Sequence, residues 1–366
     1  MKKLSAAAVL LFTALTLTAC LRGETEIAKD AGIGRETDAK YEDRDPAINP
    51  GDLQNQPETS AGYTPPPLDS PEITGTDTPS ETDASAETPP ADGKTWAFVN
   101  GKYEYYFTPR DKTAQNDLSD MANVSTAPFE DQPDDWYIGK TSYDESTGEV
   151  TYTWDRYDST IQKVEQYGGI YRGDTSQKVC YFTFDCGYEY GPTGDILDVL
   201  KEKQVPGIFF LTGQYVKEEK ELIQRMLDEG HIVGNHTVGH YRGTKLTAQQ
   251  FVDEMQGLED LFYAQFPDAD PMIYYRPPYG NCNEFTLRLA DKMGYRTVMW
   301  SYTYMDFDTS NQLPYADAMA KVKSGLHPGA VYLFHTESTT NAAILGDFID
   351  WVRAQGYEIL PICDIK

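Results

Sequence analysis

Short apolar runs alternate with helical periods from Gln177 to the C-terminus. The runs are rich in aromatic and aliphatic residues, which predicts buried strands. They cover residues 179–184, 207–212, 232–235, 273–275, 296–300, 330–334 and 357–361. Between them, apolar residues three or four positions apart predict helices around residues 196–200, 222–227 and 251–262, and further helices after Asn283, Pro314 and Thr339. This alternation is typical of an α/β domain, and its seven mostly parallel strands predict an incomplete (β/α)7-type barrel.

Polar clusters close or follow five successive runs of this domain. The clusters are Asp185 with Cys186, His236 with His240, Arg276 to Gly280, Trp300 with Asp306, and Leu333 with His335. Reactive groups gather at the carboxyl ends of the strands in such barrels, so we expect one site there. The two imidazoles suit zinc or another divalent first-row metal if an oxygen or sulfur ligand lies nearby. The alternative is that a histidine pair at this spacing is only a surface or capping feature.

The order of these clusters resembles the motif series of the polysaccharide deacetylase family, the family 4 carbohydrate esterases with a NodB-like catalytic domain. The resemblance covers about residues 169–365. It implies that Asp185 is the general base, that Arg276 holds its carboxylate, and that the backbone amide of Tyr279 stabilises the oxyanion. The residue types fit these roles, because a guanidinium can bind a carboxylate through two parallel hydrogen bonds. Pro277 and Pro278 restrict the loop that aims the amide.

The last two motifs concern the leaving group and the acetyl methyl. The resemblance implies that His335 is the general acid, that Asp306 orients it, and that Trp300 and Leu333 wall a small pocket for the methyl group. A neighbouring carboxylate keeps a histidine protonated, which a general acid requires. Trp300 and Leu333 also lie in apolar runs, so the alternative is that both are simple core residues.

Cys186 departs from the family pattern, in which an aspartate follows the catalytic aspartate and binds the metal with the two histidines. As a thiolate, Cys186 would be a third ligand beside His236 and His240. As a protonated thiol it would be a small apolar wall. We expect a bound divalent metal, zinc first, with cobalt, manganese and nickel as alternatives.

Within the family, the chain resembles the delta-lactam-biosynthetic de-N-acetylases of spore-forming bacteria, through residues 184–191, 230–236 and 327–330. This resemblance implies deacetylation of N-acetylmuramic acid in the glycan strands of peptidoglycan, on sugars that lack a stem peptide. One alternative is an N-acetylglucosamine deacetylase of peptidoglycan or another extracellular glycan. The other is a non-catalytic glycan-binding lipoprotein.

Residues 1–19 have the charged, apolar and small-residue order of a secretory signal. The segment that ends in Cys20 resembles a bacterial lipobox, which implies a lipid on Cys20 and an extracytoplasmic protein anchored to the membrane. Residues 20–94 are expected to be a disordered tether, because residues 22–92 hold 17 acidic and 5 basic residues and no hydrophobic period. The formal net charge of −27 argues against nucleic acid as a partner.

Residues 95–175 are rich in aromatic residues and form an extension of unknown fold before the expected catalytic domain at residues 176–366. Packing on that domain and contact with carbohydrate would both use such aromatic side chains, and packing is the commoner use. An extracytoplasmic location permits disulfides. Cys282 and Cys363 are the pair that we consider for one.

Overall fold

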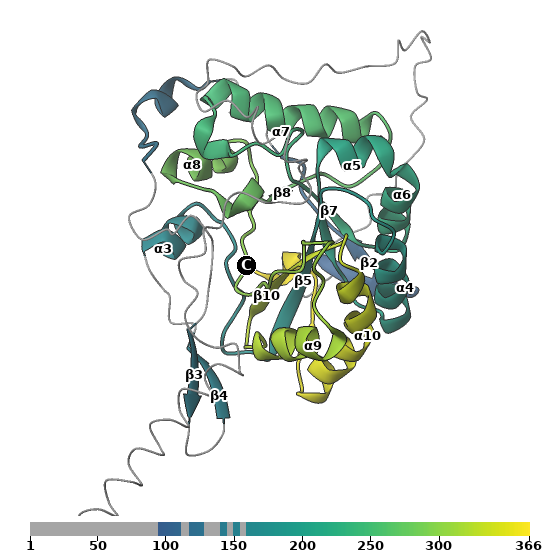
Figure 1. Cartoon of the computed structure of the whole chain (residues 1–366). Coiled ribbons are helices and arrows are strands. Elements are labelled where there is room, and N and C mark those ends of the chain that lie inside the picture. The colour runs from purple at the N-terminus through teal and green to yellow at the C-terminus, as the bar shows by residue number, and fades with distance from the viewer. Residues whose placement is uncertain (1–93, 111–116, 128–139, 145–148, 154–158) are drawn as a thin grey trace, which may run out of the picture. The chain divides into compact units, whose positions relative to one another are not determined.

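The computed structural model describes residues 94–110, 117–127, 140–144, 149–153 and 159–366 (Figure 1). The expected signal, the lipid attachment site at Cys20 and nearly all of the expected tether lie outside these residues. So do two tryptophans of the extension, Trp136 and Trp154. Within the described ranges, no helix is both long and apolar enough to cross a membrane.

Seven parallel strands form the central sheet, in the order β10-β5-β6-β7-β8-β9, with β11 paired to β5. Each of the seven expected apolar runs contains or overlaps one of them. The strands are β5 (Val179–Cys186), β6 (Ile208–Leu211), β7 (Ile232–Asn235), β8 (Tyr274–Tyr275), β9 (Arg296–Thr297), β10 (Ala330–His335) and β11 (Glu358–Ile359).

The sheet curls because the chain that follows β9 returns to β10, at the other end of the strand order. Tyr302 forms a parallel bridge with Tyr332, and the amide of Leu333 donates to the carbonyl of Tyr302 at 2.9 Å. Strand β9 is shorter than its apolar run. Beyond Thr297 the Val298 amide still donates to the Tyr275 carbonyl of β8, but the carbonyls of Val298 and Met299 accept hydrogen bonds from the side chain of Arg276. The expected incomplete barrel is confirmed.

Helices connect the strands and cover the sheet (Figure 1). They are α3 (Ser159–Gln166), α4 (Thr193–Lys203), α5 (Gly213–Glu218), α6 (Lys220–Asp228), α7 (Ala248–Tyr263), α8 (Glu284–Lys292), α9 (Tyr315–Ser324) and α10 (Thr339–Ala354). Thr247 caps α7 and Asn283 caps α8, each through a capping box, so the helix expected after Asn283 begins where it was predicted. The six-residue α5 was not expected, because it is too short to show a helical period.

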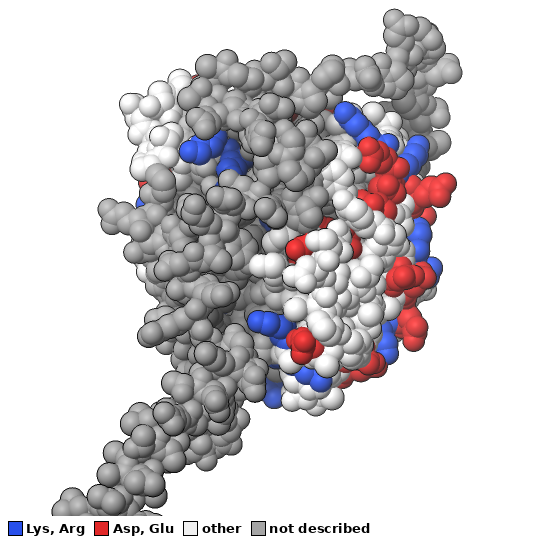
Figure 2. All heavy atoms as spheres, in the orientation of Figure 1, with Lys and Arg blue, Asp and Glu red and all other residues white. Residues whose placement is uncertain are grey.

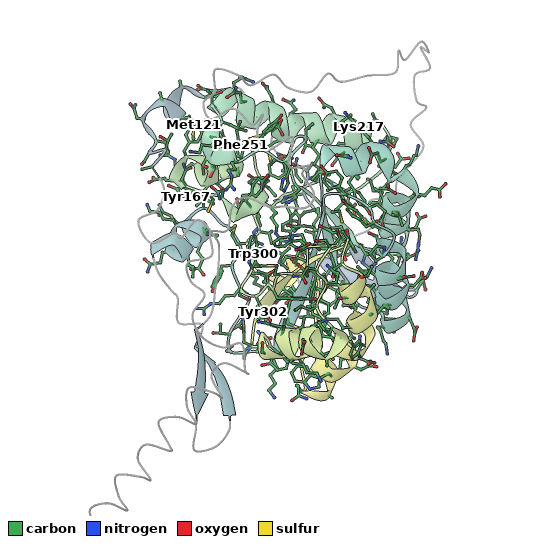
Figure 3. The ribbon with its side chains drawn as sticks, viewed as in Figure 1. Met121, Tyr167, Lys217, Phe251, Trp300 and Tyr302 are labelled. Atoms are coloured by element: carbon green, nitrogen blue, oxygen red, sulfur yellow. The ribbon has the colours of Figure 1, made fainter. Side chains whose placement is uncertain are left out.

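Strand β5 separates two clusters of buried side chains. Phe182 and Phe184 belong to the larger cluster, and the Phe182 ring stacks on Phe348 of α10 with 5.6 Å between ring centroids. Tyr181 points to the opposite face and joins the smaller cluster with Trp300, which Figure 3 labels. This alternation follows from the two-residue period of a strand. Thr183 and Asp185 continue the Tyr181 face, so polar side chains end that face of β5.

The first part of the extension packs on the barrel as a hairpin of β1 (Trp96–Val99) and β2 (Lys102–Tyr105). The Trp96 indole donates to Asp364 at 3.1 Å, and the Tyr105 hydroxyl donates to the carbonyl of Gly230 at 2.9 Å. Gly230 has a φ of +77°, and a Cβ there would lie 2.6 Å from the carbonyl oxygen of Tyr103. These contacts agree with packing as the role of this hairpin. A second hairpin consists of β3 (Lys140–Asp144) and β4 (Glu149–Thr153).

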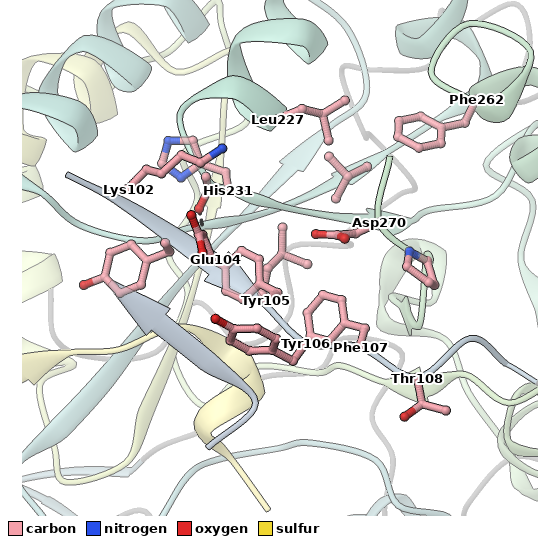
Figure 4. Close-up of a pocket in the computed structure, with 15 residues that line it drawn as sticks. Lys102, Glu104, Tyr105, Tyr106, Phe107, Thr108, Leu227, His231, Phe262 and Asp270 are labelled. Carbon is pink, nitrogen blue, oxygen red and sulfur yellow. Dashed lines mark hydrogen bonds between the residues drawn. The ribbon is translucent and has the colours of Figure 1, made fainter. Parts of the chain in front are cut away.

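A cavity of about 640 Å³ lies between β2 and the amino end of β7 (Figure 4). Tyr105, Phe107, His231 and Asp270 are among its lining residues. Burial lowers the pKa of His231 to about 3 and raises that of Asp270. The cavity is at the opposite end of the strands from the polar clusters that close them.

Charged side chains of both signs lie together along the edge of α4 and α6 (Figure 2). Arg225 pairs there with Asp198 at 2.7 Å and with Glu229 at 2.9 Å.

The disulfide that we considered is not formed. The described cysteines, Cys180, Cys186, Cys282 and Cys363, all carry unoxidised thiols. Cys282 and Cys363 are therefore not joined in this structure.

Arg110 ties the extension to the barrel through a buried ion pair with Glu259 of α7, both side chains being only 4% exposed. Its guanidinium lies over the Tyr295 ring at 3.7 Å and donates to the carbonyl of Met272 at 2.9 Å. A second ion pair, Asp120 with Lys292, joins the extension to α8 at 2.9 Å, but the Asp120 side chain is 52% exposed.

We predict that replacing Arg110 by Met lowers the free energy of unfolding by about 3–5 kcal/mol, because Glu259 is left as a buried charge without its partner. Asp120→Asn breaks an exposed pair between the same two parts of the chain and should lower the free energy of unfolding far less, because water screens that pair. Urea denaturation of the two variants measures both values. Equal losses in the two variants would contradict the conclusion that the buried Arg110–Glu259 pair contributes more to stability than the exposed Asp120–Lys292 pair.

Candidate active site

The carboxyl ends of two pairs of neighbouring strands, β10 with β5 and β7 with β8, bring the expected site residues together. Asp185 of β5 lies directly opposite His335 of β10 in the parallel register. Asn235 of β7 is opposite Tyr275 of β8, so His236 and Arg276 follow at the same level. The prediction that the clusters share one end of the sheet is therefore correct for these side chains.

Arg276 is fully buried and holds the carboxylate of Asp185 through Nη1 at 2.7 Å. Its other donors reach the Thr183 hydroxyl at 2.7 Å and the Val298 carbonyl at 3.1 Å. Burial alone would raise the pKa of Asp185, but the charge of Arg276 first, with that of His335 and that of His236 when protonated, lowers it overall. Asp185 is therefore ionised at neutral pH, as a general base must be.

His236 and His240 face each other across 3.1 Å between their Nε2 atoms. The Nδ1 atom of His236 lies 2.9 Å from the carbonyl of Arg276, which fits a proton on Nδ1 and a lone pair on Nε2. Asp185 Oδ2 is 3.5 Å from the same Nε2 atom. The turn between the histidines has Thr237 and His240 at positive φ, and the Thr237 hydroxyl accepts from the His240 amide at 3.0 Å.

This pair has the donor atoms for a divalent metal. Burial lowers the pKa of His236 despite the nearby Asp185, so its imidazole is neutral and can bind a cation. Two Nε2 atoms that converge over a short distance suit two positions of one coordination sphere. Among the described residues, no group of three His, Cys, Asp or Glu side chains is arranged to hold a metal. Within the part of the chain that the structure describes, the geometry supports His236 and His240 as protein ligands.

Cys186 is placed away from these histidines. Its side chain is fully buried in the larger apolar cluster with Phe184, Leu211 and Tyr215, because it follows Asp185 on the strand and so points to the other face. Burial raises the pKa of the Cys186 thiol well above its usual value, which favours the neutral form. The structure thus gives no support to Cys186 as a metal ligand.

His335 and Asp306 form a close pair on the other side of Asp185. Nδ1 of His335 lies 2.7 Å from Asp306 Oδ1, and the His335 amide donates to Oδ2 at 2.9 Å. Burial would lower the pKa of His335, but the charge and hydrogen bond of Asp306, with Glu337 and Asp185, raise it to about 10. His335 is therefore protonated at neutral pH, as a general acid must be.

Tyr279 lies in the expected loop at φ 60° and ψ 10°, inside the short 3-10 turn η5 (Pro278–Gly280). Its ring is 4.8 Å from that of His240. Trp300 and Leu333 are 7% and 3% exposed, within the cluster on the Asp185 side of β5. Their burial agrees with the core interpretation, and a role in an acetyl pocket stays a prediction.

Two asparagines with a supporting role were not predicted. Asn341 of α10 donates from Nδ2 to Asp306 Oδ2 at 2.6 Å and accepts from the Tyr304 hydroxyl. Asn235 accepts from the Thr237 amide at 2.9 Å and donates to the Tyr295 hydroxyl at 2.9 Å. The only signal for Asn235 was its place next to His236. Asn341 gave none, since a polar residue in the first turn of a helix is common.

Comparison with known proteins decides the family. Residues 172–298 match the model of the polysaccharide deacetylase family. The peptidoglycan-N-acetylmuramic acid deacetylase PdaA of Bacillus subtilis is 42% identical over 202 residues, which cover 55% of this chain and 76% of that protein. The chain belongs to the polysaccharide deacetylase family.

The solved structure of B. subtilis PdaA, described as a family 4 carbohydrate esterase, has a TM-score of 0.58 and 38% identity to this deacetylase. It covers 64% of this chain and 98% of its own. The peptidoglycan-N-acetylglucosamine deacetylase PgdA of Listeria monocytogenes is 30% identical over 197 residues, covering 53% of this chain and 40% of that protein.

A third relative is a family 4 pseudoenzyme of Bacillus anthracis, at 25% identity and a TM-score of 0.50. It covers 54% of this chain and 68% of its own. Family membership alone therefore does not prove activity, and the chemistry of the site has to support it.

We predict that Asp306→Asn shifts the alkaline limb of the deacetylase pH–rate profile from near the His335 pKa of about 10 to lower pH. Without the carboxylate, burial dominates and His335 loses its proton at lower pH. Asn341→Ala should shift the limb the same way by a smaller amount. An Asp306→Asn profile that keeps the wild-type alkaline limb would contradict the pairing.

Proposed function

We propose that this protein hydrolyses the N-acetyl group of N-acetylmuramic acid in peptidoglycan, on sugars without a stem peptide. One observation carries the proposal: an ionised Asp185 and a protonated His335 lie opposite each other on adjacent strands. A base and an acid in one site are what amide hydrolysis requires, because water must lose a proton and the amine must gain one. The 42% identity to PdaA supports muramic acid as the sugar.

In this mechanism, Asp185 takes a proton from the attacking water as the water oxygen bonds to the acetyl carbon. The backbone amide of Tyr279 donates to the oxyanion that forms. His335 then gives its proton to the nitrogen as the carbon–nitrogen bond breaks. The products are acetate and a free amino sugar, with one water consumed.

The proposed function includes a divalent metal, which His236 and His240 would hold. Zinc is the first candidate, with cobalt, manganese and nickel as alternatives. When bound, such a metal supplies a Lewis acid that polarises the acetyl carbonyl and acidifies water. The hydrogen bond from His236 to the Arg276 carbonyl keeps the imidazole aimed for this task.

Two alternatives have some support. The identity to PgdA favours N-acetylglucosamine as the sugar, with the same chemistry. The pseudoenzyme relative supports the non-catalytic part of the other alternative, a glycan-binding lipoprotein. Against this second alternative, a protein that only binds glycan has no need for a buried base and a partly buried acid whose pKa values are shifted in opposite directions.

We also propose that the enzyme works outside the cytoplasm, attached to the membrane by a lipid on Cys20. The support is the signal-like pattern of residues 1–19 and the acidic composition of the segment after it. A long tether would let the catalytic domain reach the glycan strands while the anchor stays in the membrane.

We predict that mass spectrometry of peptidoglycan fragments shows loss of acetyl from muramic acid where the stem peptide is absent. Asp185→Asn and His335→Ala should each slow this loss by at least about 100-fold. Asp308→Asn, which removes a carboxylate two residues from Asp306, is the control and should stay near the wild-type rate. Loss of acetyl from glucosamine would favour the first alternative, and no loss from any fragment would favour the second.

We predict that calorimetric titration with zinc detects binding that His236→Ala weakens by more than about 100-fold, since one of two protein ligands is lost. Cys186→Ser should bind as the wild type does, because the thiol points into the apolar cluster. If Cys186→Ser weakens binding as strongly as His236→Ala, the thiolate is a ligand after all.

A further inference from the structure

Two adjoining cavities follow the hairpin of β1 and β2 at the amino end of the barrel. The larger, of about 640 Å³, lies along residues 102–108 (Figure 4). The smaller, of about 350 Å³, lies at the hairpin tip, beside the carboxyl ends of α4 and α6. Lys102, Tyr103 and His231 line both. Each volume is in the range of ligand pockets. Together they form an elongated groove, which we call the hairpin groove.

One face of the hairpin is aromatic along both strands. The antiparallel register places two pairs on this face, Trp96 with Tyr105 and Phe98 with Tyr103. Phe107 continues the face, and its ring stacks on that of Tyr105 with 5.3 Å between centroids. Phe98 is 44% exposed, and its ring lies 4.8 Å from that of Tyr103. Packing on the barrel therefore does not fully use this face, and its open part lies beside the groove.

A buried hydrogen-bond donor lies in the wall of the groove. His231 is 5% exposed, and its Nδ1 atom accepts from the Gly207 amide at 3.2 Å, so the ring proton is on Nε2. Nε2 is buried and has no hydrogen-bond partner among the described residues. A buried donor without an acceptor costs free energy. A ligand oxygen in the groove would satisfy it.

The charged side chains that line the groove are mixed in sign. The basic ones are Lys102, Lys201 and Arg225, and the acidic ones are Glu104, Asp228, Glu229 and Asp270. Figure 4 shows the Asp270 carboxylate pointing toward the Tyr105 ring. Three bases against four acids leave little net charge, so the groove is not built to attract a polyanion or a polycation.

A sugar ring has the two properties that this lining calls for. Its C–H groups carry partial positive charge and pack on the negative face of an aromatic ring. Its hydroxyl and acetamide groups exchange hydrogen bonds with carboxylates, amines and an imidazole N–H. A purely apolar ligand would instead leave the His231 donor and the charged side chains without partners.

We propose that the hairpin groove is a second glycan-binding site, which holds a strand of N-acetylated amino sugars without cleaving it. The inference goes beyond the proposed function and does not depend on which sugar loses its acetyl group. Asp185 and His335 lie at the other end of the strands, so the sugars in the groove are out of their reach. In a wall of many strands, holding one strand raises the effective concentration of the others at the active site.

The test measures glycan binding and catalysis separately in the full chain. Co-sedimentation with insoluble peptidoglycan measures binding, with Asp185→Asn present in every chain so that the glycan is not modified. Without that change, kcat and KM for acetate release are measured on intact glycan and on a short soluble oligosaccharide from the same glycan. The variants are Phe98→Ala and Tyr103→Ala. Val99→Ala is the matched control, since Val99 lies on the other face of the same strand.

Phe98→Ala and Tyr103→Ala should each weaken binding to insoluble peptidoglycan about 3–10-fold, because each removes one ring from the groove. Both should raise KM on intact glycan and leave kcat unchanged. On the short oligosaccharide, which reaches one site at a time, both should react as the wild type does. Val99→Ala should change none of these values. A structural role of the rings would instead lower activity on both substrates.

Unchanged binding in both aromatic variants, or equal losses on the two substrates, would overturn the glycan site while the proposed function stands. A wild-type dimer in analytical ultracentrifugation that Phe98→Ala turns into a monomer would assign the groove to a second copy of the chain, and so would also overturn it. If the wild type releases no acetate but the two variants still bind less glycan, the proposed function fails and the second site stands.

Discussion

The buried side chain of Arg276 is the interaction on which the site depends. It joins β5, through Thr183 and Asp185, to the carbonyls of Val298 and Met299 beyond β9. Its guanidinium also lies 4.3 Å from the Phe210 ring of β6. A buried ion pair pays heavily in lost hydration, so stability alone does not explain it. The arrangement makes sense as the means of keeping a carboxylate ionised and in one orientation.

Asp185 and His335 show how one environment can support two opposite protonation states. Arg276 lowers the pKa of Asp185, and Asp306 raises that of His335 to about 10. Each group is charged at neutral pH because its partner has the opposite charge. A base and an acid whose pKa values are shifted in opposite directions by their surroundings are the usual sign of acid–base catalysis. The pair also explains why Asn341 matters, since it holds the carboxylate that supports His335.

Much of the fold was predictable because parallel strands are buried on both faces and so appear as continuous apolar runs. β7 was expected at residues 232–235 and is found there. Strand β9 was expected to extend to Trp300, but its pairing with β8 ends at the hydrogen bond from the Val298 amide to the Tyr275 carbonyl, and the carbonyls of Val298 and Met299 accept from the Arg276 side chain. Local pattern cannot reveal a donor that lies elsewhere in the chain. The six-residue α5 was missed for a different reason, its length.

In the site, too, residues that a local motif marks could be predicted from the sequence, whereas features that depend on the three-dimensional structure could not. His236, His240 and Arg276 were found because motif order placed them at strand ends, and the parallel register brings them together. The direction of Cys186 was not given by its motif position, because adjacent residues on a strand point to opposite faces.

The central claim is that water cleaves the acetamide of stem-free muramic acid at the site of Asp185 and His335. Incubation of stem-free glycan strands in water enriched in heavy oxygen tests it most directly. The account predicts that wild-type protein releases acetate carrying one heavy oxygen atom, that muramic acid gains a free amine in equal amount, and that the Asp185→Asn variant does neither. Acetate without the label, or equal release by the variant, would contradict the account.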